Sequence, residues 1–140
     1  SHARAHQALA AIDPDLGEIV RRFGSAQVRA SGTVGGNLAN GSPIGDLAPA
    51  FIALGATIHL RKGGAERSLP LEDFFIAYRK QDREPGEFVT GVRVPRLRER
   101  EHSRLFKVTK RFDEDISAVM GAFRLTLDGE RISEARIAYG

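Results

Sequence analysis

The sequence contains no cysteine, so this chain cannot by itself form a disulfide, a zinc–thiolate site or an iron–sulfur cluster. It also lacks an apolar run near the ~20 residues that a helix needs to cross a bilayer, and its N-terminus lacks the apolar core of a signal peptide. These absences are typical of a cytoplasmic protein without a membrane partner. The chain begins with serine, so we expect residue 1 to lie inside a longer natural sequence.

Aromatic residues are scarce, at 7%, and the basic residues are spread along the chain. The densest basic segment, residues 93–104, also contains Glu99 and Glu101, and aromatic side chains do not alternate with basic ones as a nucleic-acid platform requires. The net charge of +3 therefore does not indicate a nucleic-acid partner. Hydrophobic content of 41% and charged content of 28% are those of an ordinary globular chain of one domain or one and a half.

The N-terminal part is predicted to be helical. Residues 3–12 are alanine-rich, and Asp13 followed by Pro14 is a good N-cap and first-turn pair for a second helix. His2 and His6 are four residues apart and could share a metal ion. Because no cysteine or carboxylate is close to them in sequence, we expect solvent-exposed helix histidines instead.

Small polar residues concentrate in residues 31–46, which contain five glycines. A core cannot be built from such residues, so their density needs another explanation. Closely spaced glycines let a ligand approach the main chain and can turn successive N–H groups toward an anion such as a phosphate. We predict a loop that holds a phosphate-bearing ligand, with a plain glycine-rich connection between core elements as the alternative. The stretch is neither a Rossmann nor a Walker motif.

Asp46 follows this stretch and is a plausible N-cap for a helix that ends before Gly55. A helix N-terminus carries partial positive charge and unpaired N–H groups, which also favours an anion. The alternative is that Asp46 only caps the helix and contacts no ligand.

The second half of the chain is predicted to be rich in strands. A Gly-Gly turn at 63–64 joins strands at 56–61 and 66–69, and a short helix follows Pro70. The further expected strands are residues 87–94, 104–110, 116–127 and 132–139. Asp128-Gly129 is a hairpin signal between the last two strands. The charged segment 95–102 is interpreted as a linker.

Residues 27–37, QVRASGTVGGN, followed by SPIGDL at 42–47, resemble the flavin-binding domain of xanthine dehydrogenases, which are molybdenum hydroxylases. The resemblance is greatest to the small, FAD-carrying subunit of a bacterial enzyme. Matches continue in order at residues 75–80, 106–107 and 110–116. Ordered segments over nearly the whole chain are more specific than a single glycine pattern.

The resemblance implies an α+β fold in two parts. Residues 1–98 would form the second subdomain of a two-subdomain FAD-binding domain, an antiparallel sheet with flanking helices. Residues 99–140 would begin the C-terminal flavoprotein domain. In the family an earlier subdomain completes the FAD site, and no candidate for its glycine loop precedes Phe23. We therefore expect part of an FAD site, and no activity from the isolated fragment.

The resemblance also implies a function. In the parent enzyme xanthine is oxidised to urate, and electrons pass from a molybdenum cofactor through 2Fe–2S clusters to FAD and then to NAD. The molybdenum cofactor and the clusters would lie on partner domains or subunits. The alternatives are the flavin subunit of a carbon monoxide dehydrogenase, an aldehyde oxidase or a hydroxybenzoyl-CoA reductase, or an assembly fragment that does not hold FAD alone.

Cofactor contacts in the glycine-rich stretch are implied by the same resemblance. Main-chain and side-chain contacts are expected from Thr33, Gly36 and Asn37. Asp46 would accept a hydrogen bond from a ribose or ribityl hydroxyl. The complete set in this stretch is Gly32, Thr33, Gly35, Gly36, Asn37, Asn40, Gly45 and Asp46.

Flavin contacts outside the stretch are implied as well. Phe23, Phe88 and Val89 would wall the flavin, and by themselves they would be ordinary core residues. Lys107 would place a cation near the isoalloxazine and stabilise the anion that develops there on reduction. The acidic run 113–115 would lie near the flavin or nicotinamide without an assigned role. No catalytic residue and no metal ligand is predicted.

Overall fold

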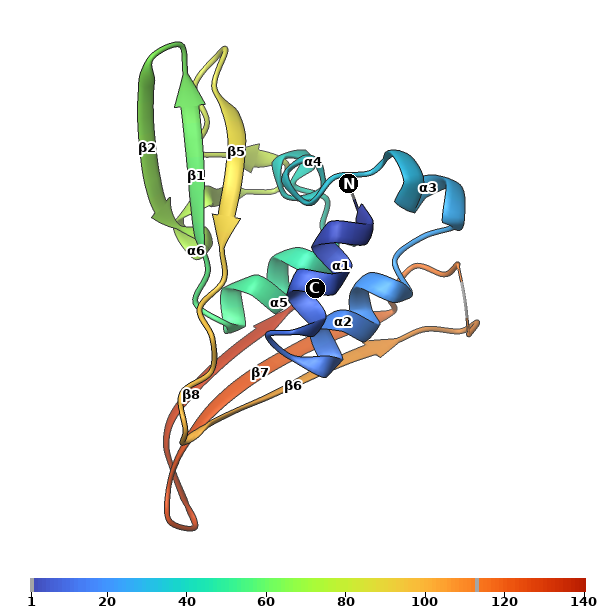
Figure 1. The fold of residues 1–140 in the computed structure, drawn as a ribbon, viewed down its shortest axis with the longest axis vertical. Helices are drawn as coiled ribbons and strands as arrows, with labels where there is room; N and C mark the ends of the chain where they lie inside the picture. Colours follow the sequence, from blue (N-terminus) through green and yellow to red (C-terminus); the bar gives the residue numbers. More distant parts are fainter. Residues whose placement is uncertain (1, 113) are drawn as a thin grey trace.

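The computed structural model describes residues 2–112 and 114–140, with side chains from residue 5 onward. Short helices lie beside and between two three-stranded antiparallel sheets (Figure 1). This mixture of helices and antiparallel sheets confirms the predicted α+β fold. The predictions for the side chain of His2 and for Asp113 lie outside the described residues.

The helices are α1 (His2–Ala10), α2 (Pro14–Arg21), α3 (Ala26–Ser31), α4 (Val34–Asn40), α5 (Leu47–Ala53) and α6 (Leu71–Phe74). The strands are β1 (Thr57–Lys62), β2 (Ala65–Pro70), β3 (Phe75–Ala77), β4 (Lys80–Gln81), β5 (Phe88–Arg93), β6 (Glu101–Val108), β7 (Val119–Asp128) and β8 (Arg131–Tyr139). The sheets have the orders β2-β1-β5, β3-β4 and β6-β7-β8.

The start of α2 follows the prediction. The Asp13 side chain accepts a hydrogen bond from the backbone N–H of Leu16 at 3.2 Å, and Pro14 occupies the first turn. Capping of this kind satisfies an N–H group that has no acceptor within the helix. The buried side chains of Leu16, Ile19 and Val20 then place this helix against the core.

The glycine-rich stretch is not the predicted loop, because much of it is helical. Ser25 caps α3 by accepting from the N–H of Val28 at 3.3 Å, and Thr33 caps α4 by accepting from the N–H of Gly36 at 2.9 Å. Gly41, with φ of +57°, ends α4 in the left-handed conformation that glycine adopts without a Cβ clash. The Thr33 hydroxyl cap thus starts a helix where glycine density alone indicated irregular backbone.

The predicted hairpin of β1 and β2 is present, and β5 pairs with the other edge of β1. A second hairpin, β3–β4, was not predicted from the sequence. Its turn places Arg79 at φ of +55°, a conformation that arginine seldom adopts. Without glycine or asparagine at that position, the sequence carries no usual turn signal there.

The C-terminal sheet contains the predicted strands with shifted ends. Glu101 and His102 belong to β6 rather than to the expected linker, because they pair with Thr126 and Leu125 of β7. The predicted hairpin at Asp128-Gly129 joins β7 to β8. Strand β7 begins three residues later than expected, at Val119.

One hydrophobic core serves both parts of the chain. It joins buried residues of α2, α5, α6 and β1 to Leu105 of β6 and to Met120 and Ala122 of β7. The sheet β6-β7-β8 therefore packs against the same helices that support the N-terminal part. The division of the chain at residue 98 stays a prediction about domain organisation.

Candidate functional site

A cleft of about 370 Å³ lies between α4 and β5, which are neighbours in Figure 1. Its lining residues are Thr33, Val34, Gly35, Gly36, Val89, Thr90, Gly91 and Val92. The helix approaches the strand closely, since a Cβ atom on Gly35 would lie 3.3 Å from Cγ1 of Val89. Of the predicted cofactor contacts, the structure brings Thr33, Gly35, Gly36 and Val89 together here.

Asn37 lies one residue beyond Gly36 in α4. Its Oδ1 atom is buried, and among the described residues it has no hydrogen-bond donor. A buried acceptor without a partner costs roughly 1–3 kcal/mol unless a ligand or water supplies the donor. Gly45 lies against this amide, because a Cβ atom there would be 3.8 Å from Oδ1. The Asn37 amide therefore has an unused acceptor, and Asn37 itself is not among the residues that line the cleft.

Asp46 is at the N-cap position of α5, but the predicted cap is absent, because its side chain forms no capping hydrogen bond with this helix. Its Oδ2 atom lies 2.5 Å from Nζ of Lys107, and its Oδ1 atom accepts a hydrogen bond from the hydroxyl of Ser117. The Asp46 and Lys107 side chains are 4% and 5% exposed. A buried charge requires a counter-charge, and this requirement draws the carboxylate away from the helix terminus.

Other predicted contacts do not line the cleft. Phe23 is half-buried after α2, and its carbonyl accepts a hydrogen bond from Arg29. Gly32 follows α3, and its N–H donates to the carbonyl of Val28. Phe88 is 52% exposed, and Asn40 is exposed at the end of α4. Their predicted roles toward a flavin stay predictions.

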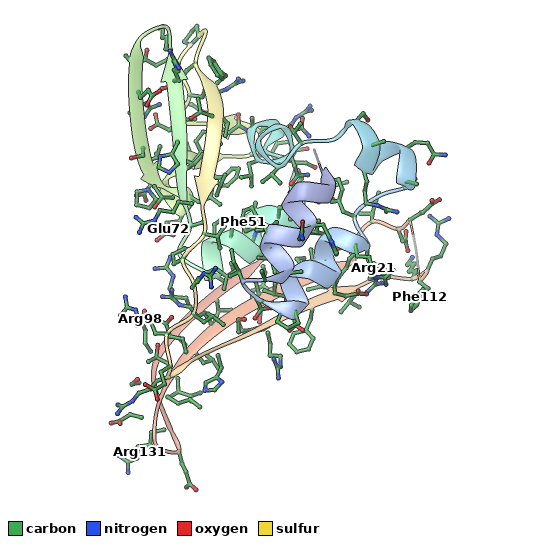
Figure 2. All side chains as sticks on the ribbon, in the orientation of Figure 1. Arg21, Phe51, Glu72, Arg98, Phe112 and Arg131 are labelled. Carbon is green, nitrogen blue, oxygen red and sulfur yellow. The ribbon has the colours of Figure 1, made fainter. Side chains whose placement is uncertain are left out.

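Arg22 follows α2 and contacts the connection between β6 and β7. Its Nη2 atom donates to Oγ1 of Thr109 at 3.3 Å and to the carbonyl of Phe112 at 3.0 Å. The guanidinium also lies 5.4 Å from the centre of the Phe112 ring. Figure 2 labels Phe112 on the same side of the molecule as Arg21, the last residue of α2. Sequence reasoning missed this contact because it joins residues 87–90 positions apart.

Of the acidic run 113–115, the structure describes Glu114 and Asp115. The Asp115 carboxylate accepts hydrogen bonds from the backbone N–H groups of Arg111, at 2.8 Å, and of Ile116. The bond from Arg111 is the largest cause that lowers the pKa of Asp115. This local turn orders the connection between β6 and β7.

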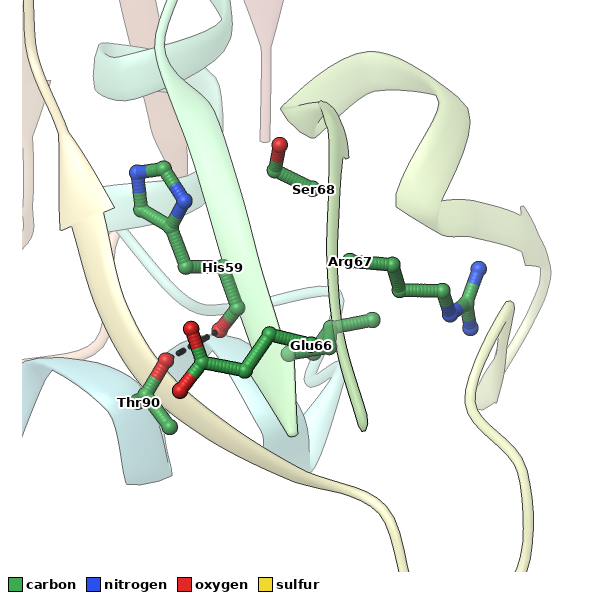
Figure 3. Close-up of a pocket in the computed structure, with 6 residues that line it drawn as sticks. His59, Glu66, Arg67, Ser68 and Thr90 are labelled. Atoms are coloured by element: carbon green, nitrogen blue, oxygen red, sulfur yellow. Dashed lines mark hydrogen bonds between the residues drawn. The ribbon is translucent and has the colours of Figure 1, made fainter. Parts of the chain in front are cut away.

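A second cleft of about 150 Å³ lies on the face of the β2-β1-β5 sheet (Figure 3). His59, Glu66, Ser68 and Thr90 contribute to its lining, and the Thr90 hydroxyl donates to the carbonyl of His59 at 3.2 Å. Figure 3 shows the guanidinium of Arg67 directed away from His59. The cleft is a polar hollow on the hairpin, for which the sequence predicted no chemistry.

Arg67 forms a charged cluster on the other side of the hairpin. Its Nε atom lies 2.7 Å from Oε1 of Glu87, and its Nη1 atom lies 2.8 Å from Oδ2 of Asp82. The hydrogen bonds from Arg67 lower the pKa of Glu87 to about 2, and burial opposes this shift. The carboxylates in turn raise the pKa of Arg67.

This cluster predicts acid sensitivity. The pKa of Glu87 is lower in the folded state than its ordinary value of 4.5, so its charge stabilises the fold above about pH 4.5. That contribution is lost as the pH falls from 4.5 toward 2. We expect the melting temperature of Glu87→Gln to lie below that of wild type at pH 6, and the difference to shrink by pH 3.

The matched control for this experiment is Glu66→Gln. Glu66 forms an exposed pair with Arg61 at 3.6 Å, and such pairs contribute little. We therefore expect its melting temperature to follow wild type at every pH. Equal behaviour of the two variants would contradict the role assigned to the Arg67 cluster.

Within residues 2–112 and 114–140, no group of three His, Cys, Asp or Glu side chains could hold a metal ion. None of the helices described in that range is long and apolar enough to span a bilayer.

Comparison with known families identifies the class of protein. Residues 1–97 match the FAD binding domain in molybdopterin dehydrogenase, and residues 104–140 match the CO dehydrogenase flavoprotein C-terminal domain. The chain therefore belongs to the FAD-binding domain family of the molybdopterin dehydrogenases. This confirms the resemblance that the sequence motifs indicated.

Individual relatives are consistent with this family. The chain is 38% identical over 128 residues to xanthine dehydrogenase 1 of Arabidopsis thaliana. This alignment covers 88% of this chain and 9% of the relative. It is 33% identical over 130 residues to nicotinate hydroxylase hnxS of Emericella nidulans, with 89% of this chain and 10% of the relative aligned. The chain thus spans about a tenth of the length of these curated relatives.

Solved structures share the fold. Reconstituted CO dehydrogenase from Oligotropha carboxidovorans superposes with a TM-score of 0.88 at 27% identity, over 99% of this chain and 49% of that chain. Quinoline 2-oxidoreductase from Pseudomonas putida 86 superposes with a TM-score of 0.86 at 29% identity, over 100% of this chain and 49% of that chain. The chain spans about half of each of these solved chains.

Proposed function

We propose that this chain forms part of the FAD site of a xanthine dehydrogenase-type molybdenum hydroxylase. In that enzyme FAD would receive electrons from iron–sulfur clusters and pass them to NAD. The iron–sulfur domain and the molybdenum-cofactor subunit would be its partners. A cytoplasmic location is part of the proposal and rests on the cysteine-free sequence.

The buried, unpartnered Oδ1 atom of Asn37 is the observation that carries the proposal. Asn37 follows the cleft residue Gly36 in α4, and its amide lies toward Gly45. A ribityl or ribose hydroxyl of FAD would supply the missing donor. At about 370 Å³ the cleft is near the lower end of the roughly 300–1,000 Å³ range of ligand sites. That size fits a site to which a second subdomain also contributes.

The residues present fit the cofactor in their chemistry. Thr33, Gly35 and Gly36 leave the cleft floor without bulky side chains, and Val89 supplies an apolar wall. Asp46 would accept a hydrogen bond from a hydroxyl of the cofactor. Lys107 would place its positive charge toward the flavin ring and remain paired with Asp46. The flavin itself supplies the electron chemistry once bound.

The choice of parent enzyme rests on sequence identity. The curated relatives named xanthine dehydrogenase are 33–38% identical over most of this chain. The solved CO dehydrogenase chains are 27–28% identical. A flavin subunit of a CO dehydrogenase, an aldehyde oxidase or a hydroxybenzoyl-CoA reductase is the second candidate, favoured by the close superposition on CO dehydrogenase. An assembly fragment without FAD is the third.

Flavin content and reduction by NADH test this proposal. We expect the whole protein that contains this chain to purify with about one FAD per copy and to lose its flavin absorbance when NADH is added without oxygen. Flavin that NADH does not reduce would contradict the NAD assignment alone. A colourless protein that does not bind added FAD would contradict the cofactor assignment. Titration of the 140-residue chain with FAD then shows whether this part binds FAD alone.

A further inference from the structure

We infer that Ser117 is a positioning residue of the FAD site, acting through Asp46. This inference rests on the proposed function, because it assumes that Asp46 contacts the cofactor. The Ser117 hydroxyl donates a hydrogen bond to Oδ1 of Asp46, while Lys107 holds Oδ2 at 2.5 Å. The family resemblance gave no role to Ser117, and no sequence signal singled it out.

The geometry assigns separate tasks to the two partners of the carboxylate. Lys107, on β6, supplies the charge that allows Asp46 to be buried. Ser117 lies in the connection before β7 and engages the other oxygen. Because both oxygens are held, the carboxylate cannot rotate about its Cβ–Cγ bond without breaking a hydrogen bond. Its orientation is therefore fixed before a ligand arrives.

The backbone next to Ser117 is also fixed. The N–H of Ala118 donates to the carbonyl of Val108 at 2.8 Å, which extends the pairing of β6 and β7 by one bond. Ser117 is thus anchored to the end of a sheet rather than placed on a free loop. A hydroxyl held in this way can orient Asp46 more accurately than an unanchored side chain.

An ionised carboxylate accepts hydrogen bonds at about four lone-pair positions. Lys107 and Ser117 occupy one position on each oxygen and leave others for a hydroxyl of the cofactor. Without Ser117, the carboxylate is free to turn toward Lys107 and pair through both oxygens. The positions available to the cofactor would then change even though Asp46 stays buried and charged.

Ser117→Ala in the whole flavoprotein tests the inference. We expect FAD affinity to fall about tenfold or more, since hydrogen bonds to charged groups contribute about that much. Ser117→Thr keeps the hydroxyl and should restore most of the affinity. The measurement is an FAD titration of the apoprotein by fluorescence quenching, with the melting temperature recorded for each variant. Ser117→Cys has a thiol, a weak hydrogen-bond donor of similar size, and should bind FAD as weakly as Ser117→Ala. It serves as the test variant if Ser117→Ala does not fold.

Ser103→Ala is the matched control. Ser103 is buried on β6 and its hydroxyl donates to the carboxylate of Asp13, the same kind of bond at a carboxylate to which no cofactor contact is assigned. We expect a lower melting temperature for this variant and an unchanged FAD affinity. If Ser117→Ala and Ser103→Ala both keep wild-type FAD affinity, Ser117 has only a structural role and the inference is wrong. If the wild-type protein itself fails to bind FAD, the proposed function fails instead.

Discussion

Replacing Lys107 with methionine is expected to lower the free energy of unfolding by about 3–5 kcal/mol, because it removes one partner of a buried ion pair. The Lys107 and Asp46 side chains are 5% and 4% exposed, so water cannot replace the lost ammonium group effectively. The remaining carboxylate keeps only its hydrogen bond from Ser117 among the side-chain bonds described. The measurement is equilibrium unfolding in urea at neutral pH.

A double variant separates the cost of the orphaned charge from the loss of packing. In Lys107→Met with Asp46→Asn, no charge is left buried, and we expect part of the lost stability to return. The matched control is Lys62→Met, which removes an exposed lysine paired with Glu84 at 3.0 Å. Such a pair is worth about 0–1 kcal/mol. Equal losses for Lys107→Met and Lys62→Met would show that the Asp46–Lys107 pair is exposed in solution.

This pair shows where sequence reasoning ends. The resemblance indicated Asp46 and Lys107 as separate contacts of one cofactor, but not that they contact each other. They are 61 positions apart, and only the tertiary structure brings Lys107 of β6 to the residue that precedes α5. For the same reason the helix-cap role of Asp46 was predicted wrongly. Local preference favours the cap, and tertiary structure supplies a stronger partner.

Local signals were reliable where the neighbouring sequence determines the structure. The cap at Asp13 and the turns at Gly63 and Gly129 depend on a few adjacent residues, and each is found as predicted. The glycine-rich stretch was mistaken for a loop because glycine weakens helices on average. There, caps at Thr33 and Gly41 and the packing of α4 on β5 outweigh that tendency.

Replacing Gly35 with valine is expected to weaken FAD binding about tenfold to a hundredfold, the range that corresponds to an overpacking cost of about 1–3 kcal/mol. Even a lone Cβ atom added at this position would lie only 3.3 Å from Cγ1 of Val89. The larger valine side chain would therefore force α4 away from β5. Both walls of the cleft then move. The measurement is the FAD dissociation constant of the whole apoprotein, together with its circular dichroism spectrum.

Gly64→Val is the control, because a Cβ atom there meets nothing within 4 Å and the residue lies in the turn between β1 and β2. Gly36 would be a poorer test than Gly35, since its Cβ atom would lie 2.8 Å from Oγ1 of Thr33 and disturb the cap of α4 itself. Glycine costs a helix about 1 kcal/mol relative to alanine, so its presence at position 35 is explained by close packing and not by helix preference. Unchanged FAD affinity in Gly35→Val with a native spectrum would therefore mean that the cofactor binds outside this cleft.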